Sequence, residues 1–199
     1  MARTGRPREF DRQAALEAAL VLFWKQGYEP TSLSQLKEAM GGISPTSFYA
    51  AFGSKESLFR EALALYRTTE GSVTDILRNE SIAPRQAIEQ CLRLSVKMQT
   101  DNSHPLGCLV VSGASNCGPE NAAVAELLKI ERQSNRTAIK AQLERARANG
   151  EIADDTDVDA LAEMFNTFLV GISTAARDGS TRDDLDRAID QLMRFWPER

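Results

Sequence analysis

The chain has 199 residues, enough to bury a hydrophobic core and to form one large or two small domains. Its net charge of -4 argues at first sight against a nucleic-acid partner, but the charge is uneven, with +2 on residues 1–67 and -6 on residues 68–199. No apolar run is long enough to span a membrane, and no apolar segment follows the first arginines as in a signal peptide. We therefore expect a cytoplasmic protein whose three cysteines are free thiols.

Residues 1–10 are predicted to form a flexible basic arm. Arg3, Arg6 and Arg8 lie there among glycine and proline, without apolar periodicity. Arms of this kind can place arginine side chains in the minor groove of DNA. Taken alone, the segment also fits a disordered tail with incidental arginines. Its position directly before a helix-turn-helix pattern favours the DNA-binding interpretation.

Two short helices are predicted after the arm. Asp11 can cap the first, whose apolar residues recur at helical spacing until Gly27 ends it. The second begins at Thr31 and Ser32, with Gln35 at the position of a capping box. Thr31 and Ser32 could also contact DNA phosphates through the start of this helix, although capping explains both residues equally well.

A third helix is predicted to follow across a tight corner. Gly41 and Gly42 end the second helix, because glycine adopts the left-handed conformation at little steric cost. Two phenylalanines four residues apart mark the buried side of the third helix and leave its hydroxyl groups free for DNA. Thr46 and Ser47 suit base edges, and a tyrosine hydroxyl suits a phosphate. The candidate DNA contacts here and at the start of the next helix are Ser44, Thr46, Ser47, Tyr49 and Lys55.

A spaced set of residues runs through this corner: Gly42, Ile43, Ser44, Phe48, Tyr49, Phe52, Ser54, Lys55, Glu56 and Leu58. The set resembles the DNA-binding signature of the TetR family of bacterial transcriptional regulators. Residues 23–36 look like that family's first turn and the start of its second helix. The chain departs from the pattern at Pro45, Ala50 and Ala51. The resemblance implies a repressor that a small-molecule effector releases from DNA.

An all-α protein of two domains is expected. Residues 11–67 form the predicted DNA-binding head, and residues 68–199 form a helical ligand-binding and dimerisation domain. One long helix from Lys55 to Leu77 is expected to join them as a lever. Further helices are expected at residues 84–98, within 106–117, and at 119–149, 158–176 and 185–196.

The last two predicted helices carry enough apolar surface to be buried on more than one side. Paired with their copies they would form a four-helix interface, and a homodimer would place two heads on one double-stranded operator. The alternative is that they close the core of a single chain. The expected interface residues are Val158, Leu161, Phe165, Leu169, Ile172, Leu185, Ile189, Leu192 and Trp196.

The effector itself is not identified by the sequence. Cys108 could sense electrophiles or oxidants, as thiols do in some TetR-like regulators, if its pKa is lowered and it is accessible. The alternative is that Cys108 is a small buried hydrophobic residue, and that the aromatic and methionine side chains are ordinary core. The candidate effector or redox-sensing residues are Met98, Cys108, Asn116, Cys117, Phe165 and Phe168.

Other functional classes find less support in the sequence. His104 and the cysteines lack metal-ligand spacing, so no metal site or cofactor is predicted. With one histidine and no nucleophile or phosphate-binding motif, an enzyme is not predicted either. The main alternative to a regulator is a helical small-molecule carrier or adaptor whose head does not bind DNA specifically. Salt-dependent binding to a palindrome would separate this rival from a regulator.

Overall fold

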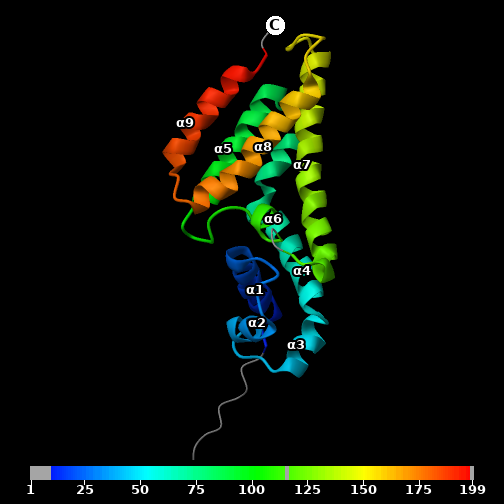
Figure 1. Ribbon diagram of the computed structural model, residues 1–199, viewed down its shortest axis with the longest axis vertical. Helices are drawn as coiled ribbons and strands as arrows, with labels where there is room; N and C mark the ends of the chain where they lie inside the picture. The colour runs from blue at the N-terminus through cyan, green and yellow to red at the C-terminus, as the bar shows by residue number, and fades with distance from the viewer. Residues whose placement is uncertain (1–9, 115–116, 198–199) are drawn as a thin grey trace, which may run out of the picture.

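The computed structural model describes residues 10–114 and 117–197, and all regular elements within these ranges are helical, as predicted. At one end α1 (Arg12–Gln26), α2 (Leu33–Ala39) and α3 (Pro45–Phe52) form the head. The long helices of the second domain lie at the other end, and α4 (Lys55–Thr68) connects the two (Figure 1). No helix in the described ranges is long and apolar enough to cross a membrane.

The predicted helix starts in the head are confirmed by side-chain caps. Asp11 accepts a hydrogen bond from the Ala14 amide, and Ser32 forms the capping box with Gln35. Ser44 and Ser54 cap α3 and α4 in the same way. The corner between α2 and α3 contains two glycines with φ of 84° and 78°, values that only glycine adopts without strain. These local interactions fix the helix-turn-helix geometry.

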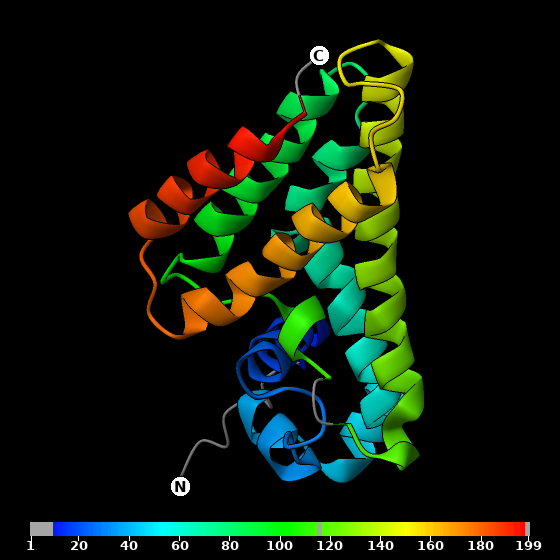
Figure 2. The same ribbon diagram turned by 45° about the horizontal axis from the view of Figure 1, so that its top comes forward.

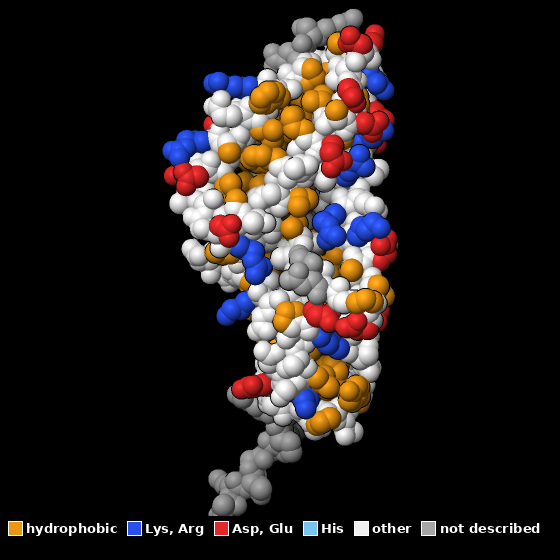
Figure 3. Space-filling model, in the orientation of Figure 1, with side chains coloured by type: hydrophobic (Ala, Val, Ile, Leu, Met, Phe, Trp, Pro, Cys, Tyr) orange, Lys and Arg blue, Asp and Glu red, His pale blue; other side chains and the backbone are white. Residues whose placement is uncertain are grey.

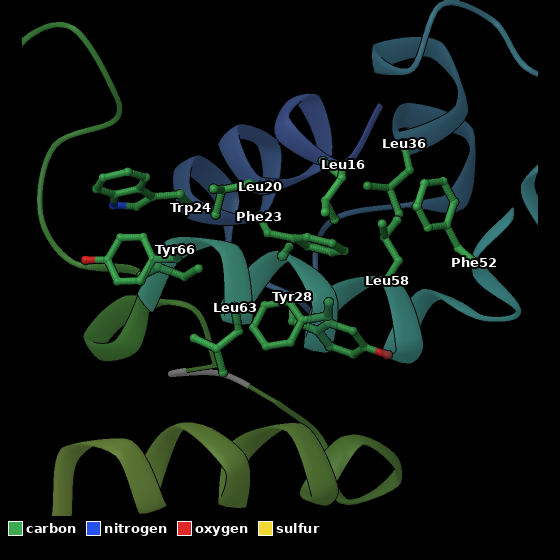
Figure 4. Close-up of a cluster of buried hydrophobic side chains, with 14 of the residues drawn as sticks. Leu16, Leu20, Phe23, Trp24, Tyr28, Leu36, Phe52, Leu58, Leu63 and Tyr66 are labelled. Carbon is green, nitrogen blue, oxygen red and sulfur yellow. The ribbon is translucent and has the colours of Figure 1, made fainter. Parts of the chain in front are cut away.

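Aromatic side chains hold α1 against α4 in the core of the head (Figure 4). Phe23 meets Phe59 edge to face, with 5.0 Å between ring centroids, and Tyr28 packs on both rings. Phe48 and Phe52 are buried beside them and anchor α3. Because these two side chains face inward, the opposite side of α3 must face solvent.

The predicted long lever from Lys55 to Leu77 is interrupted. The α-helix α4 ends at Thr68, and the chain continues through Thr69 into the 3-10 helix η1 (Glu70–Arg78). The Thr69 hydroxyl donates to the Leu65 carbonyl at 2.8 Å. Gly71 then packs so closely on Tyr66 that a Cβ atom would lie 2.7 Å from its ring. These contacts turn the chain where sequence periodicity alone suggested continuity.

The second domain is a bundle in which α5 packs against α7, α8 and α9, and α8 packs against α7 (Figure 2). Phe165 and Trp196 lie in its core, with 6.4 Å between their ring centroids. The helix predicted within residues 106–117 is the single turn α6. The elements are α5 (Pro84–Gln99), α6 (Leu109–Ser112), η2 (Pro119–Asn121), α7 (Ala122–Ala148), α8 (Val158–Arg177), α9 (Arg182–Leu192) and η3 (Met193–Phe195).

Most of the predicted dimer-interface residues are instead buried in the core of their own chain. These are Val158, Phe165, Leu169, Ile172, Leu185, Ile189 and Trp196. The prediction was wrong for these seven side chains, because a helical apolar stripe indicates burial without saying what covers it. Leu161 and Leu192 are partly exposed and remain available to a second chain.

Candidate nucleic-acid interface and ligand cavity

One side of α3 presents polar side chains to solvent. Ser44, Thr46 and Ser47 are exposed, and Tyr49 is 53% exposed. The hydroxyl oxygens of Ser44 and Ser47 lie 2.9 Å apart at the helix start. The Tyr49 ring rests edge-on against Phe48, which is fully buried, so its hydroxyl is directed away from the core. This surface, made of Ser44, Thr46, Ser47 and Tyr49, is called the α3 surface below.

The two candidate DNA contacts before α2, Thr31 and Ser32, differ in their exposure. Ser32 is exposed at the first turn of α2, where backbone N–H groups can also reach a phosphate. Thr31 is fully buried, and its hydroxyl donates to the Gly27 carbonyl at 2.6 Å. Thr31 therefore stabilises the turn between α1 and α2 and cannot touch a duplex. Neither of the two roles considered for Thr31 is correct, because Ser32 and not Thr31 caps α2.

Lys55 is half-buried at the start of α4. Its Nζ lies 4.2 Å from the centre of the Tyr28 ring and donates to the Glu29 carbonyl at 3.4 Å. Burial lowers the pKa of Lys55, while Glu29 and Cys117 act in the opposite direction. In this conformation the cation is held against the turn before α2 and must swing outward to meet a phosphate.

Four of the predicted site residues fall outside the described ranges. They are Arg3, Arg6, Arg8 and Asn116.

A junction of aromatic side chains connects the head to the second domain. The Trp24 indole N–H donates to the Gly107 carbonyl at 3.1 Å, and its ring stacks on His104 with centroids 4.5 Å apart. The same indole meets Tyr66 edge-on at 4.9 Å, and Figure 4 shows the two rings together at one end of the head core. The Tyr66 hydroxyl in turn lies 3.3 Å from the Cys108 sulfur.

Arg177 makes a second connection between the two parts. From the last turn of α8 it donates to the carbonyl of Lys25 at 3.1 Å and to that of Trp24 at 3.5 Å. It also donates to the Ser112 hydroxyl at 3.1 Å. A cation at the carbonyl end of α1 is electrostatically favourable, so α8 and the head are held together by charge as well as by packing. Sequence periodicity did not reveal this role, because Arg177 contacts residues far away in the chain.

A cavity of about 60 Å³ lies directly behind Tyr66 and Cys108. Its walls come from α4, η1, α5, α6, α7 and α8. Of the predicted effector residues, Met98 and Cys108 line it. Phe165 is buried in the bundle core, Phe168 is partly exposed, and neither is among the lining residues. The polar part of the wall includes Gln99, Arg132, Asn135 and Asn166.

The two half-exposed cysteines occupy different surroundings. Burial raises the pKa of the Cys108 thiol, against the smaller effects of Tyr66 and Arg132. Burial and the nearby Glu29 also raise the pKa of Cys117, which lies beside Lys55 rather than in the cavity. Neither thiol has the lowered pKa that a reactive sensor needs. Cys108 is therefore a neutral part of the cavity wall in this conformation.

The chain matches the family model for bacterial regulatory proteins of the tetR family over residues 15–62, and that for the tetracyclin repressor-like C-terminal domain over residues 84–192. It is 34% identical over 195 residues to the HTH-type transcriptional repressor ComR of Escherichia coli (strain K12), covering 98% of this chain and 92% of that protein. The chain belongs to the TetR family.

Two further similar proteins extend this result. BdcR of Escherichia coli (strain K12), an HTH-type transcriptional repressor, is 29% identical over 182 residues, which cover 91% of this chain and 86% of BdcR. A cysteine mutant of the TetR family regulator CifR, solved with 26bp double-strand operator DNA, is 42% identical. It superposes with a TM-score of 0.88 over 97% of this chain and 100% of that one.

Family membership settles the functional class. A TetR-family protein is a DNA-binding transcriptional regulator and not an enzyme, which agrees with the prediction from the α3 segment. The rival interpretation of a carrier that does not use its head on DNA loses its support.

The residues that sequence reasoning overlooked are Gln99, Arg132 and Arg177. Two of them, Gln99 and Arg177, stand at helix ends, and no local pattern marked any of the three.

Proposed function

We propose that this chain is a cytoplasmic repressor that binds a two-fold symmetric operator as a homodimer and leaves it when a small molecule fills the cavity. The exposed α3 surface carries the proposal, because four hydroxyl-bearing side chains stand on the side of a helix-turn-helix that faces away from its core. The repressor names of ComR and BdcR and the operator complex of CifR support it.

The proposed role of each candidate DNA contact follows from its position along the helices. Thr46 and Ser47, in the first turn, are placed to contact base edges in the major groove. Tyr49 and Ser32 are placed for phosphates, with Lys55 joining them once it leaves the Tyr28 ring. We assign the arginines of residues 1–9 to the minor groove beside the site, as the sequence suggested.

We infer a dimer surface that differs from the predicted one. Partly exposed apolar side chains recur along α8 on a face adjacent to its buried stripe, and Phe195 beyond α9 is 66% exposed. Figure 3 shows hydrophobic side chains gathered along α8 and beside α9. Large exposed apolar patches mark interaction sites. The side chains assigned to this α8–α9 surface are Leu161, Met164, Phe168, Ala175, Leu192 and Phe195.

The release mechanism follows from the position of the cavity. Tyr66 and Cys108 line it, and Tyr66 also contacts Trp24 in the head. A ligand that fits the cavity better when Tyr66 has moved would shift Trp24 and the end of α1. It would weaken DNA binding by the difference in its affinity for the two arrangements.

A gel-shift experiment with DNA flanking the chain's own gene tests the proposal. The full-length protein should shift a palindromic fragment, with an affinity that falls steeply as salt rises. A protein that shifts no such fragment more strongly than random DNA would overturn it.

Two substitutions on the α3 surface should have distinguishable effects. Tyr49→Phe removes a phosphate contact and should weaken binding to all operator variants by a similar factor. Thr46→Ala removes a base contact and should change the preference at one base pair per half-site, by about 1–3 kcal/mol. Binding to a set of single-base operator variants measures both. Gln133→Ala, exposed on α7, is the control and should leave binding unchanged. Identical profiles for Tyr49→Phe and Thr46→Ala would contradict the assignment.

A further inference from the structure

The cavity contains hydrogen-bond acceptors without donors. Gln99 is 2% exposed at the end of α5, and its side-chain Oε1 has no hydrogen-bond partner among the described residues. The side-chain Oδ1 of Asn166 on α8 is also buried and has no hydrogen-bond partner among the described residues. Both residues line the cavity. A buried acceptor without a donor is costly, so these two oxygens indicate a ligand that donates hydrogen bonds.

The cavity also contains a cation without a counterion. Arg132 of α7 lines the wall, and its Nη1 donates to the Val110 carbonyl at 2.6 Å. No carboxylate of the described residues lies within ion-pair distance of it, whereas the other charged groups of the lining are paired, Arg67 with Glu131 and Arg78 with Asp75. Arginine stays protonated in proteins, so a half-buried guanidinium without a counterion indicates an anionic ligand.

Cys108 is a group whose negative charge would act on the Arg132 guanidinium. Burial raises the pKa of this thiol, so it remains neutral near pH 7 and does not compensate Arg132. The guanidinium charge is therefore available to pair with an anion that enters the cavity.

The size of the cavity limits the ligand. One water molecule needs about 10–15 Å³ of such volume, so about 60 Å³ holds roughly four to six non-hydrogen atoms. Met98, Val110 and Leu169 supply apolar wall beside the polar groups. A ligand of this size can carry one charged group, one hydroxyl and a short apolar part.

We propose that the effector is a small hydroxycarboxylate whose carboxylate pairs with Arg132 and whose hydroxyl donates to Gln99 or Asn166. This inference rests on the proposed function, since it names the ligand class of the release site. A simple anion would satisfy Arg132 and leave the amide oxygens without a donor. A neutral alcohol would satisfy the amide oxygens and leave the guanidinium unpaired.

Three small molecules of nearly equal size separate these possibilities. Lactate carries both groups, lactamide lacks the charge and propionate lacks the hydroxyl. Isothermal titration of the full-length protein should show that lactate binds about tenfold or more tightly than either analogue. Glycolate and 3-hydroxybutyrate extend the test to shorter and longer chains. Binding of lactamide or propionate as tight as that of lactate overturns the proposal, and so does failure of all three hydroxycarboxylates to bind.

A matched pair of variants assigns the charge recognition to one residue. Arg132→Gln should bind lactate and lactamide with equal affinity. Arg136→Gln, one turn along α7, removes an exposed arginine that pairs with Glu163 at 2.6 Å outside the cavity, and should keep the preference for lactate. Equal behaviour of the two variants would overturn the assignment to Arg132. Should Arg132→Gln fail to fold, the double variant Gln99→Leu with Asn166→Leu replaces it and is expected to abolish the preference for lactate over propionate, because both acceptors for the ligand hydroxyl are then gone.

Operator binding without any effector separates failure of this inference from failure of the proposed function. If the protein shifts its operator but binds no hydroxycarboxylate, the proposed function stands and the proposed effector class is wrong. If it binds lactate as described but shifts no palindrome, the proposed ligand site stands and the proposed repressor function is wrong. Loss of the operator shift on adding lactate is the result expected when both are correct.

Discussion

Replacing Trp24 with alanine is expected to lower the free energy of unfolding by about 3–5 kcal/mol. The indole is 1% exposed and packs between Tyr66 and His104. Its removal leaves a cavity at the junction of the head and the second domain, and it leaves the Gly107 carbonyl without its donor. Urea denaturation at a fixed protein concentration measures the change, because a dimer's apparent stability depends on concentration.

Val21 provides the matched control on the same helix. Its side chain is 49% exposed on α1, so Val21→Ala should change the free energy of unfolding by less than about 0.5 kcal/mol. A loss below about 1 kcal/mol for Trp24→Ala would show that the two parts of the chain are not held together through this indole. Trp24→Phe retains part of the packing but not the hydrogen bond to Gly107, and it should fall between the two.

The features that sequence alone predicted are those fixed by neighbours in the chain. The capping box of Ser32 and Gln35 and the glycine corner at Gly41 involve residues at most three positions apart. The burial of Phe48, and with it the exposed α3 surface, follows from helical spacing within eight residues. The local sequence pattern was sufficient to predict the exposed surface of the head, because this short corner forms that surface.

The features that were missed depend on contacts that form only in the folded chain. The break after α4 arises partly from the packing of Gly71 on the Tyr66 ring, which periodicity cannot register. Thr31 looked like a free hydroxyl, but its bond to the Gly27 carbonyl exists only once the turn has formed. The unpaired Arg132 is recognisable only after α5, α7 and α8 have enclosed a cavity. A sequence shows which residues are charged, but only the fold shows which charges remain unpaired.

Replacing Phe168 with glutamate is expected to convert the proposed dimer into a monomer and to weaken operator binding by about a hundredfold or more. Phe168 is partly exposed in the middle of the apolar face of α8, so a carboxylate there would be buried without a partner in a two-fold interface. Two linked heads bind an operator far more tightly than one, because the second contact is intramolecular. Sedimentation equilibrium and gel shifts measure the two effects.

Thr174→Glu places the same charge on a different, exposed face of α8 and should leave both the dimer and the operator affinity intact. Each variant must also unfold cooperatively near the temperature of the unmodified chain, because Phe168 partly packs on its own core. A dimeric Phe168→Glu variant with full operator affinity would locate the interface elsewhere. A monomeric variant with full affinity would instead show that one head suffices. Only the loss of both the dimer and the operator affinity would link the apolar face of α8 to DNA binding. That result would mean that two α3 surfaces must bind one duplex together.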